Sequence, residues 1–486
     1  MYLLYSILLG LGVLVLLPRF VLDALRHGKY AAGLAERAGV LPEFDAGGRP
    51  VIWLHCVSVG EAQAARPLVR AFAEEYPGHA LVVSTTTQTG QRVAREVFSD
   101  TAALVFYFPF DWAWSVRRAL RAINPSAVLV METELWPRFL RECRRRGVPV
   151  ALVNGRVSEK SFRGYRLIRF FIRRALGDLR LAAMQTESDA ARVRALGLSA
   201  ERVRVTGNVK FDLEEASEQP LTGELRQRFG LDGRRPLILA ASTHAPEERI
   251  ILEAFKLLAD TAREKLLTDS SRASDASHLT DASRATGASH STDASHATRP
   301  RLLLAPRHPE RFDEVAALVE TSGLVCSRRS QSPRASDETG DVILLDSIGE
   351  LRAVYTLAEV VFVGGSIAPV GGHNVLEPAL DARCVVTGAH TSNFKAVVGA
   401  LLEADALIQL PPVEGAEAAA LLATVLRELL EDETKRRRMG ERARSVLEQN
   451  RGATARTVKL LAPLLNQMSD AGCQMLVNEK TLTSDI

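Results

Sequence analysis

The chain has 486 residues, of which 47% are hydrophobic and 24% are charged, as in globular proteins. This length is more than one ordinary core organises and predicts two domains with additional segments. The formal net charge of +3 gives no support for a nucleic-acid partner. The five cysteines lie far apart, without the spacing of a zinc site, which favours reduced thiols over a disulfide framework.

The first segment, from Met1 to Pro18, carries no charged side chain, and basic residues follow from Arg19 onward. About 17 or 18 apolar residues are near the lower limit for crossing a bilayer. No basic segment precedes this run and no cleavage site follows it, so we expect an uncleaved membrane anchor over residues 1–22. The charge distribution predicts that the body lies in the cytoplasm. The alternatives are a segment that lies in one leaflet without crossing and a buried core helix.

Apolar runs alternate with amphipathic stretches through the first half of the chain. The predicted strands are Val51–His55, Ala80–Ser84, Ala103–Phe108, Ala127–Met131, Val148–Val153, Leu181–Met184 and Val203–Thr206. Predicted helices between them include Ala62–Tyr76, Arg92–Phe98, Trp136–Arg146 and Glu187–Leu196. This alternation predicts a doubly wound α/β domain with a parallel sheet over residues 30–212.

The pattern restarts after a polar stretch, residues 213–235, which we interpret as a linker. The second set of predicted strands is Leu237–Ala241, Leu302–Ala305, Val342–Leu345, Val360–Val363 and Cys384–Thr387. They predict a second Rossmann-like domain over residues 236–440. Helical patterns at Thr434–Gln449 and Ala453–Leu465 predict closing helices over 441–465, and residues 466–486 are expected to form a loose tail.

One segment does not fit this scheme. Residues 268–298 repeat an Asp-Ala-Ser theme and contain almost no large apolar side chain, which predicts a disordered insertion. A metal-binding role for its histidines is the weaker alternative. Ser327–Gly340 is interpreted as a second, smaller polar loop.

Charged side chains follow the predicted strands of the first half. In open parallel sheets, ligands bind beyond the carboxyl ends of the strands. Glu61 follows the first strand, Glu132 directly follows the fourth, and Lys210 follows the seventh. Glu132 is preferred to Glu134 because it directly ends its strand. Together these residues predict a catalytic site at this edge of the sheet. The alternative for Glu61 alone is a favourable interaction of its carboxylate with the helix dipole.

The second half places a different set of residues at the same edge. These are Pro306 and Arg307, then Ile348, Gly349 and Glu350, then Gly364–Ser366, and finally Asn374, Val375, Leu376 and Glu377. Glycines allow backbone N–H groups to approach a phosphate, and a guanidinium can clamp one. Glu377 is placed to accept hydrogen bonds from ribose hydroxyls. The pattern predicts a nucleotide site in a cleft between the halves, the alternative being turn-forming glycines and surface charges.

Several motifs are missing. The sequence has no Walker loop and no G-x-G-x-x-G after the first strand, which disfavours ATP hydrolysis and dinucleotide-dependent dehydrogenation. It also has no Asp-x-Asp, so a metal that grips a sugar pyrophosphate would lack its usual ligands. A leaving group with one phosphate, neutralised by Lys and Arg, fits that absence.

A basic stretch at residues 163–174 carries five arginines beside Phe170, Phe171 and Ile172. We expect one basic amphipathic helix that faces anionic headgroups or a phosphorylated lipid. The alternative is a solvated charged face.

The motifs HCVSVGE, STTTQTG, METELWP, NGRVS, TGNVKFD, APRHPERF, DSIGEL and GGHNVLEP resemble, in order, those of the 3-deoxy-D-manno-octulosonic acid (Kdo) transferases. The resemblance covers residues 1–465 apart from the insertion. It implies the GT-B fold, with two Rossmann-like domains, and an inverting, metal-independent transfer without a cofactor. The implied donor is CMP-Kdo and the implied acceptor is the tetraacyl lipid A precursor, at the cytoplasmic face of the bacterial inner membrane.

The resemblance also implies roles for individual residues. Glu61 matches the catalytic base, and Glu132 and Lys210 match positions that stabilise the transition state. The positions that match CMP-binding segments are Pro306, Arg307, Ile348, Gly349, Glu350, Asn374, Val375, Leu376 and Glu377. The alternatives are another GT-B nucleotide-sugar transferase, a UDP-sugar epimerase, and a non-enzymatic nucleotide-sugar sensor, which would need no acid at Glu61.

Overall fold

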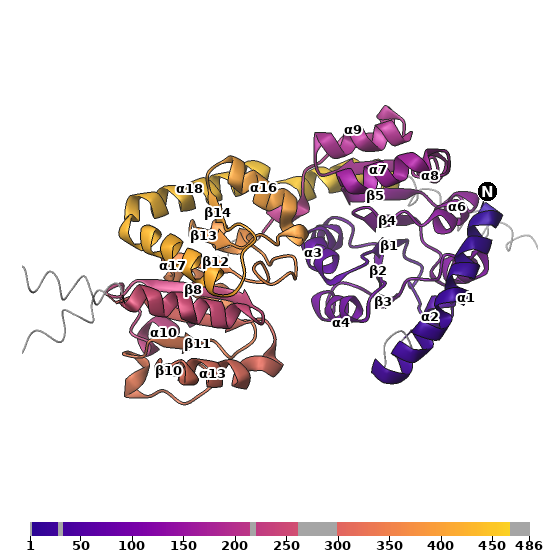
Figure 1. Ribbon diagram of the computed structural model, residues 1–486. Coiled ribbons are helices and arrows are strands. Elements are labelled where there is room, and N and C mark those ends of the chain that lie inside the picture. Colours follow the sequence, from indigo (N-terminus) through magenta and orange to yellow (C-terminus); the bar gives the residue numbers. More distant parts are fainter. Residues whose placement is uncertain (1, 28–32, 214–219, 261–298, 467–486) are drawn as a thin grey trace, which may run out of the picture. The chain divides into compact units, whose positions relative to one another are not determined.

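The computed structural model describes residues 2–27, 33–213, 220–260 and 299–466 (Figure 1). The predicted insertion, 268–298, lies outside the described residues, as does the predicted tail apart from residue 466. The chain forms two compact units, Met1–Asp212 with Asn450–Ile486, and Leu213–Gln449. Each unit is an α/β fold around one parallel sheet, so the predicted fold class of two doubly wound domains is confirmed.

The first unit contains a seven-stranded sheet in the order β3-β2-β1-β4-β5-β6-β7, with every pair parallel. The strands are β1 (Val51–His55), β2 (Ala80–Thr85), β3 (Leu104–Tyr107), β4 (Ala127–Met131), β5 (Val150–Gly155), β6 (Leu181–Met184) and β7 (Val203–Val205). Successive residues of β1 pack on opposite faces, with Trp53 in one core and Leu54 in the other. Both faces are therefore buried, as the continuous apolar runs predict.

The helices of the first unit are α1 (Tyr2–His27), α2 (Leu34–Arg37), α3 (Val59–Glu75), α4 (Gln88–Val97), α5 (Ala113–Ile123), α6 (Pro137–Arg145), α7 (Glu159–Leu167), α8 (Arg169–Leu176) and α9 (Glu187–Leu196). Of the predicted anchor, residues 1–22, the described residues 2–22 fall within α1. Within the described parts of the chain, no helix combines the length and the hydropathy needed to cross a membrane.

The basic stretch 163–174 is not one helix, contrary to expectation. It divides at Ile168, whose φ of −114° and ψ of 31° are not helical, into the end of α7 and the start of α8. Tyr165 of α7 and Ile172 of α8 both pack against the core of the first unit.

The chain returns to the first unit after its second sheet. Residues 453–466 are helical, and Val458, Leu461 and Leu465 pack in the core beneath α3 and β1. The carboxylate of Asp212 accepts hydrogen bonds from the N–H groups of Gly452 (2.6 Å) and Thr454 (2.5 Å), which caps this helix. The predicted closing segment, 441–465, is thus shared between the two units.

The second unit contains another all-parallel sheet, in the order β10-β11-β9-β8-β12-β13-β14. Its strands are β8 (Leu237–Thr243), β9 (Arg301–Pro306), β10 (Cys326–Arg328), β11 (Val342–Leu344), β12 (Val360–Val363), β13 (Cys384–Thr387) and β14 (Leu407–Gln409). The two edge strands, β10 and β14, were not predicted. The expected polar loop Ser327–Gly340 is wrong in part, because β10 and the 3-10 helix η4 (Ala335–Asp337) use some of its residues.

The helices of the second unit are α10 (Pro220–Arg228), residues 247–260, α13 (Phe312–Thr321), α14 (Leu351–Val354), α15 (Leu376–Leu380), α16 (Lys395–Glu403), α17 (Gly415–Glu431) and α18 (Glu433–Asn450). Helix α10 lies inside the stretch interpreted as a linker, 213–235. Its Leu225 and the following Phe229 are each 1% exposed. This part of the stretch therefore belongs to the second unit and does not only connect the domains.

Candidate active site

Glu61 lies in the first turn of α3, immediately beyond the carboxyl end of β1. Its side chain is oriented by the loop that joins the two elements. The Val57 N–H donates to Glu61 Oε2 at 2.8 Å, and Ser58 Oγ donates to Oε1 at 3.3 Å. Glu61 is 8% exposed. The carboxyl group is thus nearly buried but held in one orientation.

The environment of Glu61 makes its carboxyl group an acceptor for protons near neutral pH. Burial, and then the negative charge of Glu132, raise its pKa to about 8, against the opposing hydrogen bond from Val57. A group with a pKa close to the working pH is well matched to taking and releasing a proton. Such a shift at the carboxyl end of a strand is also a frequent mark of a functional site.

Glu132 and Lys210 form an ion pair in the same unit. Glu132 follows β4 in a left-handed conformation, with φ of 53°. Lys210 lies in the 3-10 helix η2 (Val209–Phe211), and its Nζ is 3.3 Å from Glu132 Oε1. Arg156 approaches the other oxygen, Oε2, at 3.6 Å. The Glu132 carboxylate therefore lies between two cations.

Asn154 fixes the position of the segment that carries Lys210. It is fully buried near the end of β5, with φ of 51°. Its Oδ1 accepts a hydrogen bond from the Val209 N–H at 3.1 Å, and Asn208 Oδ1 accepts one from the Lys210 N–H at 3.0 Å. Asn154 begins the NGRVS motif but was not among the predicted site residues. The Asn-Gly pair at a strand end was the signal that marks it, since asparagine tolerates the left-handed region.

The structure therefore brings the three predicted catalytic residues to one edge of the first sheet. Glu132 and Lys210 are in direct contact, and the charge of Glu132 acts on Glu61. Burial also raises the pKa of Glu134, with a further contribution from Glu132. Five acidic or basic groups, counting Arg156, thus share this edge, which suits a reaction in which protons and negative charge move.

In the second unit, an internal carboxylate occupies the glycine-containing loop after β12. Glu247 is fully buried, and its oxygens accept hydrogen bonds from five backbone N–H groups. The donors are His244 (3.0 Å), Gly365 (2.7 Å), Ser366 (2.8 Å), Ile367 (2.8 Å) and Ala368 (3.2 Å). The expectation that the Gly364–Ser366 loop offers these groups to a phosphate is therefore wrong. A Cβ at Gly364 would lie 2.8 Å from Glu247 Oε2, which explains the glycine.

Other predicted nucleotide-binding residues lie near the ends of β9 and β12. Pro306 is buried at the end of β9, whereas Arg307 is exposed. Asn374 Nδ2 donates to Glu377 Oε1 at 3.0 Å, and its Oδ1 accepts from the Leu376 N–H at 3.0 Å. Burial raises the pKa of Glu377, while the charges of Arg352 and Arg307 lower it. The positive charge of Arg307 thus favours the ionised form of the Glu377 carboxyl group.

The Val375 and Leu376 side chains are almost completely buried. They can therefore contribute to a ligand site only through their main-chain atoms. This distinguishes them from Arg307, whose side chain is open to solvent.

Three histidines that were not among the predicted site residues lie around the same strand ends. His244 Nε2 is 2.7 Å from His373 Nε2, and the two rings stack with an interplanar angle of 5°. The His308 ring meets His244 edge-on at 4.9 Å between centroids. Burial lowers the pKa of His373 to about 3, with His244 and Arg307 adding to the effect. The pair is therefore neutral near pH 7, with one ring donating and the other accepting.

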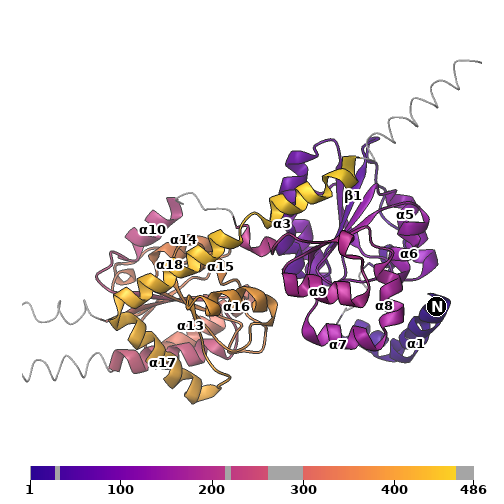
Figure 2. The same cartoon turned by 90° about the horizontal axis from the view of Figure 1, so that it is seen from above.

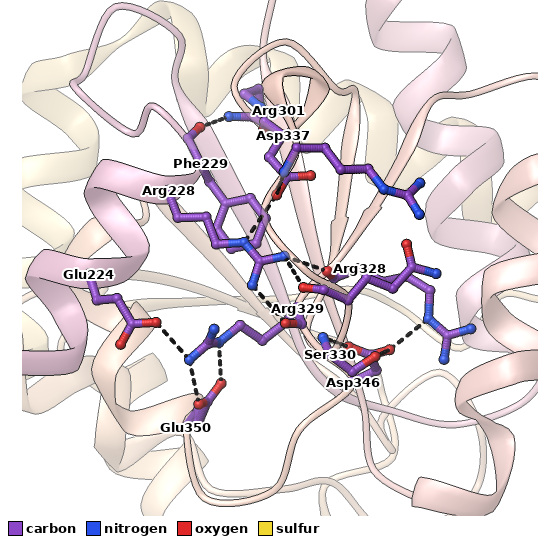
Figure 3. A network of polar contacts seen from close by, with 12 residues as sticks. Glu224, Arg228, Phe229, Arg301, Arg328, Arg329, Ser330, Asp337, Asp346 and Glu350 are labelled. Atoms are coloured by element: carbon purple, nitrogen blue, oxygen red, sulfur yellow. Dashed lines mark hydrogen bonds and ion pairs between the residues drawn. The ribbon is translucent and has the colours of Figure 1, made fainter.

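The DSIGEL segment is held by arginines from other parts of the second unit (Figure 3). Arg329 makes two hydrogen bonds to Glu350, of 3.0 and 3.1 Å, and an ion pair with Glu224 of α10 at 3.0 Å. Ile348 is 78% exposed. The Glu350 side chain thus has a structural partner, and the tip of the segment is open to solvent.

A family model and two individual relatives that are similar to this chain are all described as 3-deoxy-D-manno-octulosonic acid transferases. The family described as "3-Deoxy-D-manno-octulosonic-acid transferase (kdotransferase)" matches residues 32–213. A 3-deoxy-D-manno-octulosonic acid transferase of Haemophilus influenzae is 32% identical over 91% of this chain and 94% of its own length. One from Bordetella pertussis is 34% identical over 84% and 86%.

Among solved structures, a UDP-GlcNAc 2-epimerase from Neisseria meningitidis is similar with a TM-score of 0.51. It is 13% identical and covers 86% of this chain and all of its own. At that identity the likeness concerns the fold.

Proposed function

This chain belongs to the 3-deoxy-D-manno-octulosonic acid (Kdo) transferases, and on that premise we propose that it transfers Kdo from CMP-Kdo to the tetraacyl lipid A precursor. It is a glycosyltransferase of lipopolysaccharide biosynthesis. The finer proposal is an inverting transfer that needs no metal. The observation that carries it is the nearly buried Glu61, with a pKa of about 8, beside the Glu132–Lys210 ion pair.

In the proposed reaction, attack by the acceptor is coupled to proton transfer to Glu61. An acceptor hydroxyl attacks the anomeric carbon of Kdo, and its proton passes to the Glu61 carboxylate as the new C–O bond forms. The bond between the anomeric carbon and the CMP oxygen breaks, and the electron pair leaves with CMP. Attack from the side opposite to the leaving group inverts the anomeric centre.

Cationic side chains are proposed to offset the charge that develops. The anomeric carbon of Kdo carries a carboxylate, and the departing CMP gains negative charge on its phosphate. We assign Lys210, oriented by Glu132, to transition-state stabilisation in the first unit, and Arg307 to the CMP phosphate in the second. The proposed CMP contacts are the segments Pro306–Arg307, Ile348–Glu350 and Asn374–Glu377. In this scheme the positive charges of Lys210 and Arg307 stabilise the negative charge that a bound metal ion stabilises in metal-dependent transferases.

The acceptor is a lipid, so we further propose that the enzyme works at the cytoplasmic face of the bacterial inner membrane. The support is the uncharged segment from Met1 to Pro18 and the exposed arginines of α7 and α8. Basic side chains near an apolar surface favour anionic headgroups.

The test is transfer from CMP-Kdo to the tetraacyl lipid A precursor in detergent, with and without EDTA, followed by mass spectrometry. The proposal predicts mass gains in whole Kdo units that EDTA does not abolish. Gains that require an added divalent ion would contradict metal independence alone. CMP-Kdo binding without any gain would point to another acceptor, and no CMP-Kdo binding would contradict the donor.

A further inference from the structure

The first turns of α1 are attached to the rest of the first unit. The Tyr2 hydroxyl donates to Asp178 Oδ2 and the Tyr5 hydroxyl donates to Asp111 Oδ2, both at 2.8 Å. The Tyr5 ring also contacts the ring of Phe171 in α8, with centroids 5.5 Å apart. Asp178 is 7% exposed and Asp111 is 2% exposed. The start of α1 therefore makes specific contacts with the body of the first unit.

The chain that follows α1 is attached to the same unit. In α2, Glu36 Oε2 accepts a hydrogen bond from the Tyr107 N–H at 2.7 Å, and Arg37 Nη2 donates to the Thr86 carbonyl at 2.5 Å. Only a few residues separate His27 from Gly33, and fully extended they span at most about 20 Å. Both ends of α1 are thus connected to one body over short distances.

These two attachments are incompatible with a helix that crosses a bilayer. A crossing helix would place Tyr2 on the far side of a hydrocarbon layer about 30 Å thick, away from Asp178 and Asp111. The hydroxyl groups of Tyr2 and Tyr5 would then lose their carboxylate partners. A helix that lies along the membrane surface keeps both attachments.

Over residues 2–16, the part of α1 whose side chains the structure describes, the outer face of the helix is apolar and uncovered. Its exposed residues recur at helical spacing and include no charged side chain. They are Leu3 (71% exposed), Leu4 (59%), Ile7 (49%), Leu8 (58%), Leu11 (54%), Leu14 (65%) and Val15 (76%). Tyr2, Tyr5 and Ser6, on the other side, are only partly exposed. Such a continuous apolar surface usually marks a site of membrane or protein contact.

A second apolar group and several cations lie on the neighbouring elements. The N-terminal end of α1 lies near α8 in both views (Figures 1 and 2), in agreement with the Tyr5–Phe171 contact. At the junction of α7 and α8, Leu167 is 88% exposed and Phe170 is 78% exposed. The exposed arginines of these helices are Arg163, Arg166, Arg169, Arg173 and Arg174. Their charge is complementary to an anionic lipid surface and not to a second copy of the same basic face.

We propose that α1 lies in the plane of one leaflet of an anionic bilayer, with its Leu3–Leu4–Leu8–Leu11–Val15 face in the acyl region. The enzyme is then held on one side of the membrane and does not cross it. This inference rests on the membrane location proposed above but not on the reaction. The lipid surface replaces water over side chains that the protein leaves uncovered, which stabilises the bound state by burial of apolar area.

The depth of single spin labels along α1 in vesicles of phosphatidylethanolamine and phosphatidylglycerol tests the proposal. Labels are attached to cysteines introduced one at a time in the full chain. The positions are Leu4→Cys, Leu8→Cys, Leu11→Cys and Val15→Cys. In this background Cys326→Ser and Cys473→Ser remove two native thiols, while Cys56, Cys143 and Cys384 are buried. Collision with oxygen and with a water-soluble nickel chelate gives the depth of each label.

An in-plane helix predicts nearly the same shallow depth for all four labels. A crossing helix predicts a steady change of about 1.5 Å per residue, roughly 16 Å from residue 4 to residue 15. That gradient would overturn the proposal, and so would four labels that are all accessible to the nickel chelate. The depth readout does not depend on turnover, so it separates failure of this inference from failure of the proposed reaction.

A matched pair of variants provides a second measurement by vesicle flotation. Leu8→Asn places an amide on the proposed lipid face, whereas Leu402→Asn changes an exposed leucine of α16 (37% exposed) in the other unit. Loss of one buried leucine weakens binding by about tenfold or more. We expect that loss for Leu8→Asn and no change for Leu402→Asn. Equal binding by both variants would contradict the assigned face.

Discussion

Lys210 Nζ lies 3.3 Å from Glu132 Oε1, and both side chains are 13% exposed. The ion pair joins a residue that directly follows β4 to one that follows β7, and the buried Asn154 fixes the segment that carries Lys210. Its negative member also acts on Glu61, whose pKa it raises. The pair therefore links the position of a cation to the proton affinity of the proposed base.

The first prediction concerns the pH dependence of the wild-type enzyme. Glu61 must be deprotonated to accept a proton, and its pKa is raised to about 8. Below that value the active fraction falls about tenfold per pH unit. We expect kcat/KM for Kdo transfer to rise between pH 6 and 8, by up to about tenfold for each pH unit, and then to level off. A flat profile over this range would contradict the assignment of Glu61 as a base with a raised pKa.

Substitution of Glu132 should shift that profile. Glu132→Gln removes a negative neighbour and so stabilises the Glu61 carboxylate, which lowers its pKa. We expect the rising limb of kcat/KM to move to lower pH, by on the order of one unit. The maximal rate should fall as well, because Lys210 loses its partner. Glu201→Gln, an exposed substitution in the same unit, is the control and should leave the profile in place.

Asn154 provides a test of the contact that positions Lys210. Asn154→Gly removes the hydrogen bond to Val209 but tolerates φ of 51°, whereas Asn154→Ala removes the bond and adds backbone strain. We expect Asn154→Ala to be less stable than Asn154→Gly by about 1 kcal/mol in chemical unfolding. Both variants should lose turnover with CMP-Kdo binding unchanged. A glycine variant with full turnover would show that this contact does not position Lys210.

Glu247 has a structural role in the second unit that can be separated from ligand binding. Glu247→Ala leaves five N–H groups, four of them buried, without their acceptor, and we expect a loss of about 3–5 kcal/mol in stability. Thermal unfolding of the full chain measures it. Glu253→Gln, at an exposed position of the same helix, should change stability by no more than about 0.5 kcal/mol. Similar unfolding temperatures for the two variants would contradict the role given to Glu247.

The central strands could be predicted from the sequence because a parallel sheet buried on both faces consists of continuous apolar runs. The bounds of β1, β4 and β12 agree with the prediction to the residue. The strands β10 and β14, each of three residues at a sheet edge, were not predicted, whereas β7, which is equally short and at an edge, was.

The site was predictable where function depends on position along a strand, and not where it depends on distant contacts. Glu61, Glu132 and Lys210 each follow a strand, so local order places them at one edge. Glu247 is more than 100 residues from the loop that it fills, and no local pattern connects a glutamate to those N–H groups.

The most direct test of the account is a comparison of wild-type enzyme with Glu61→Gln, measured as turnover of CMP-Kdo together with CMP-Kdo affinity by calorimetry. Glutamine keeps an oxygen that can accept from the Val57 N–H, so the loop that holds residue 61 should persist. The account predicts that turnover falls by about 10²- to 10⁴-fold while affinity for CMP-Kdo is unchanged. Near-wild-type turnover by Glu61→Gln would contradict it.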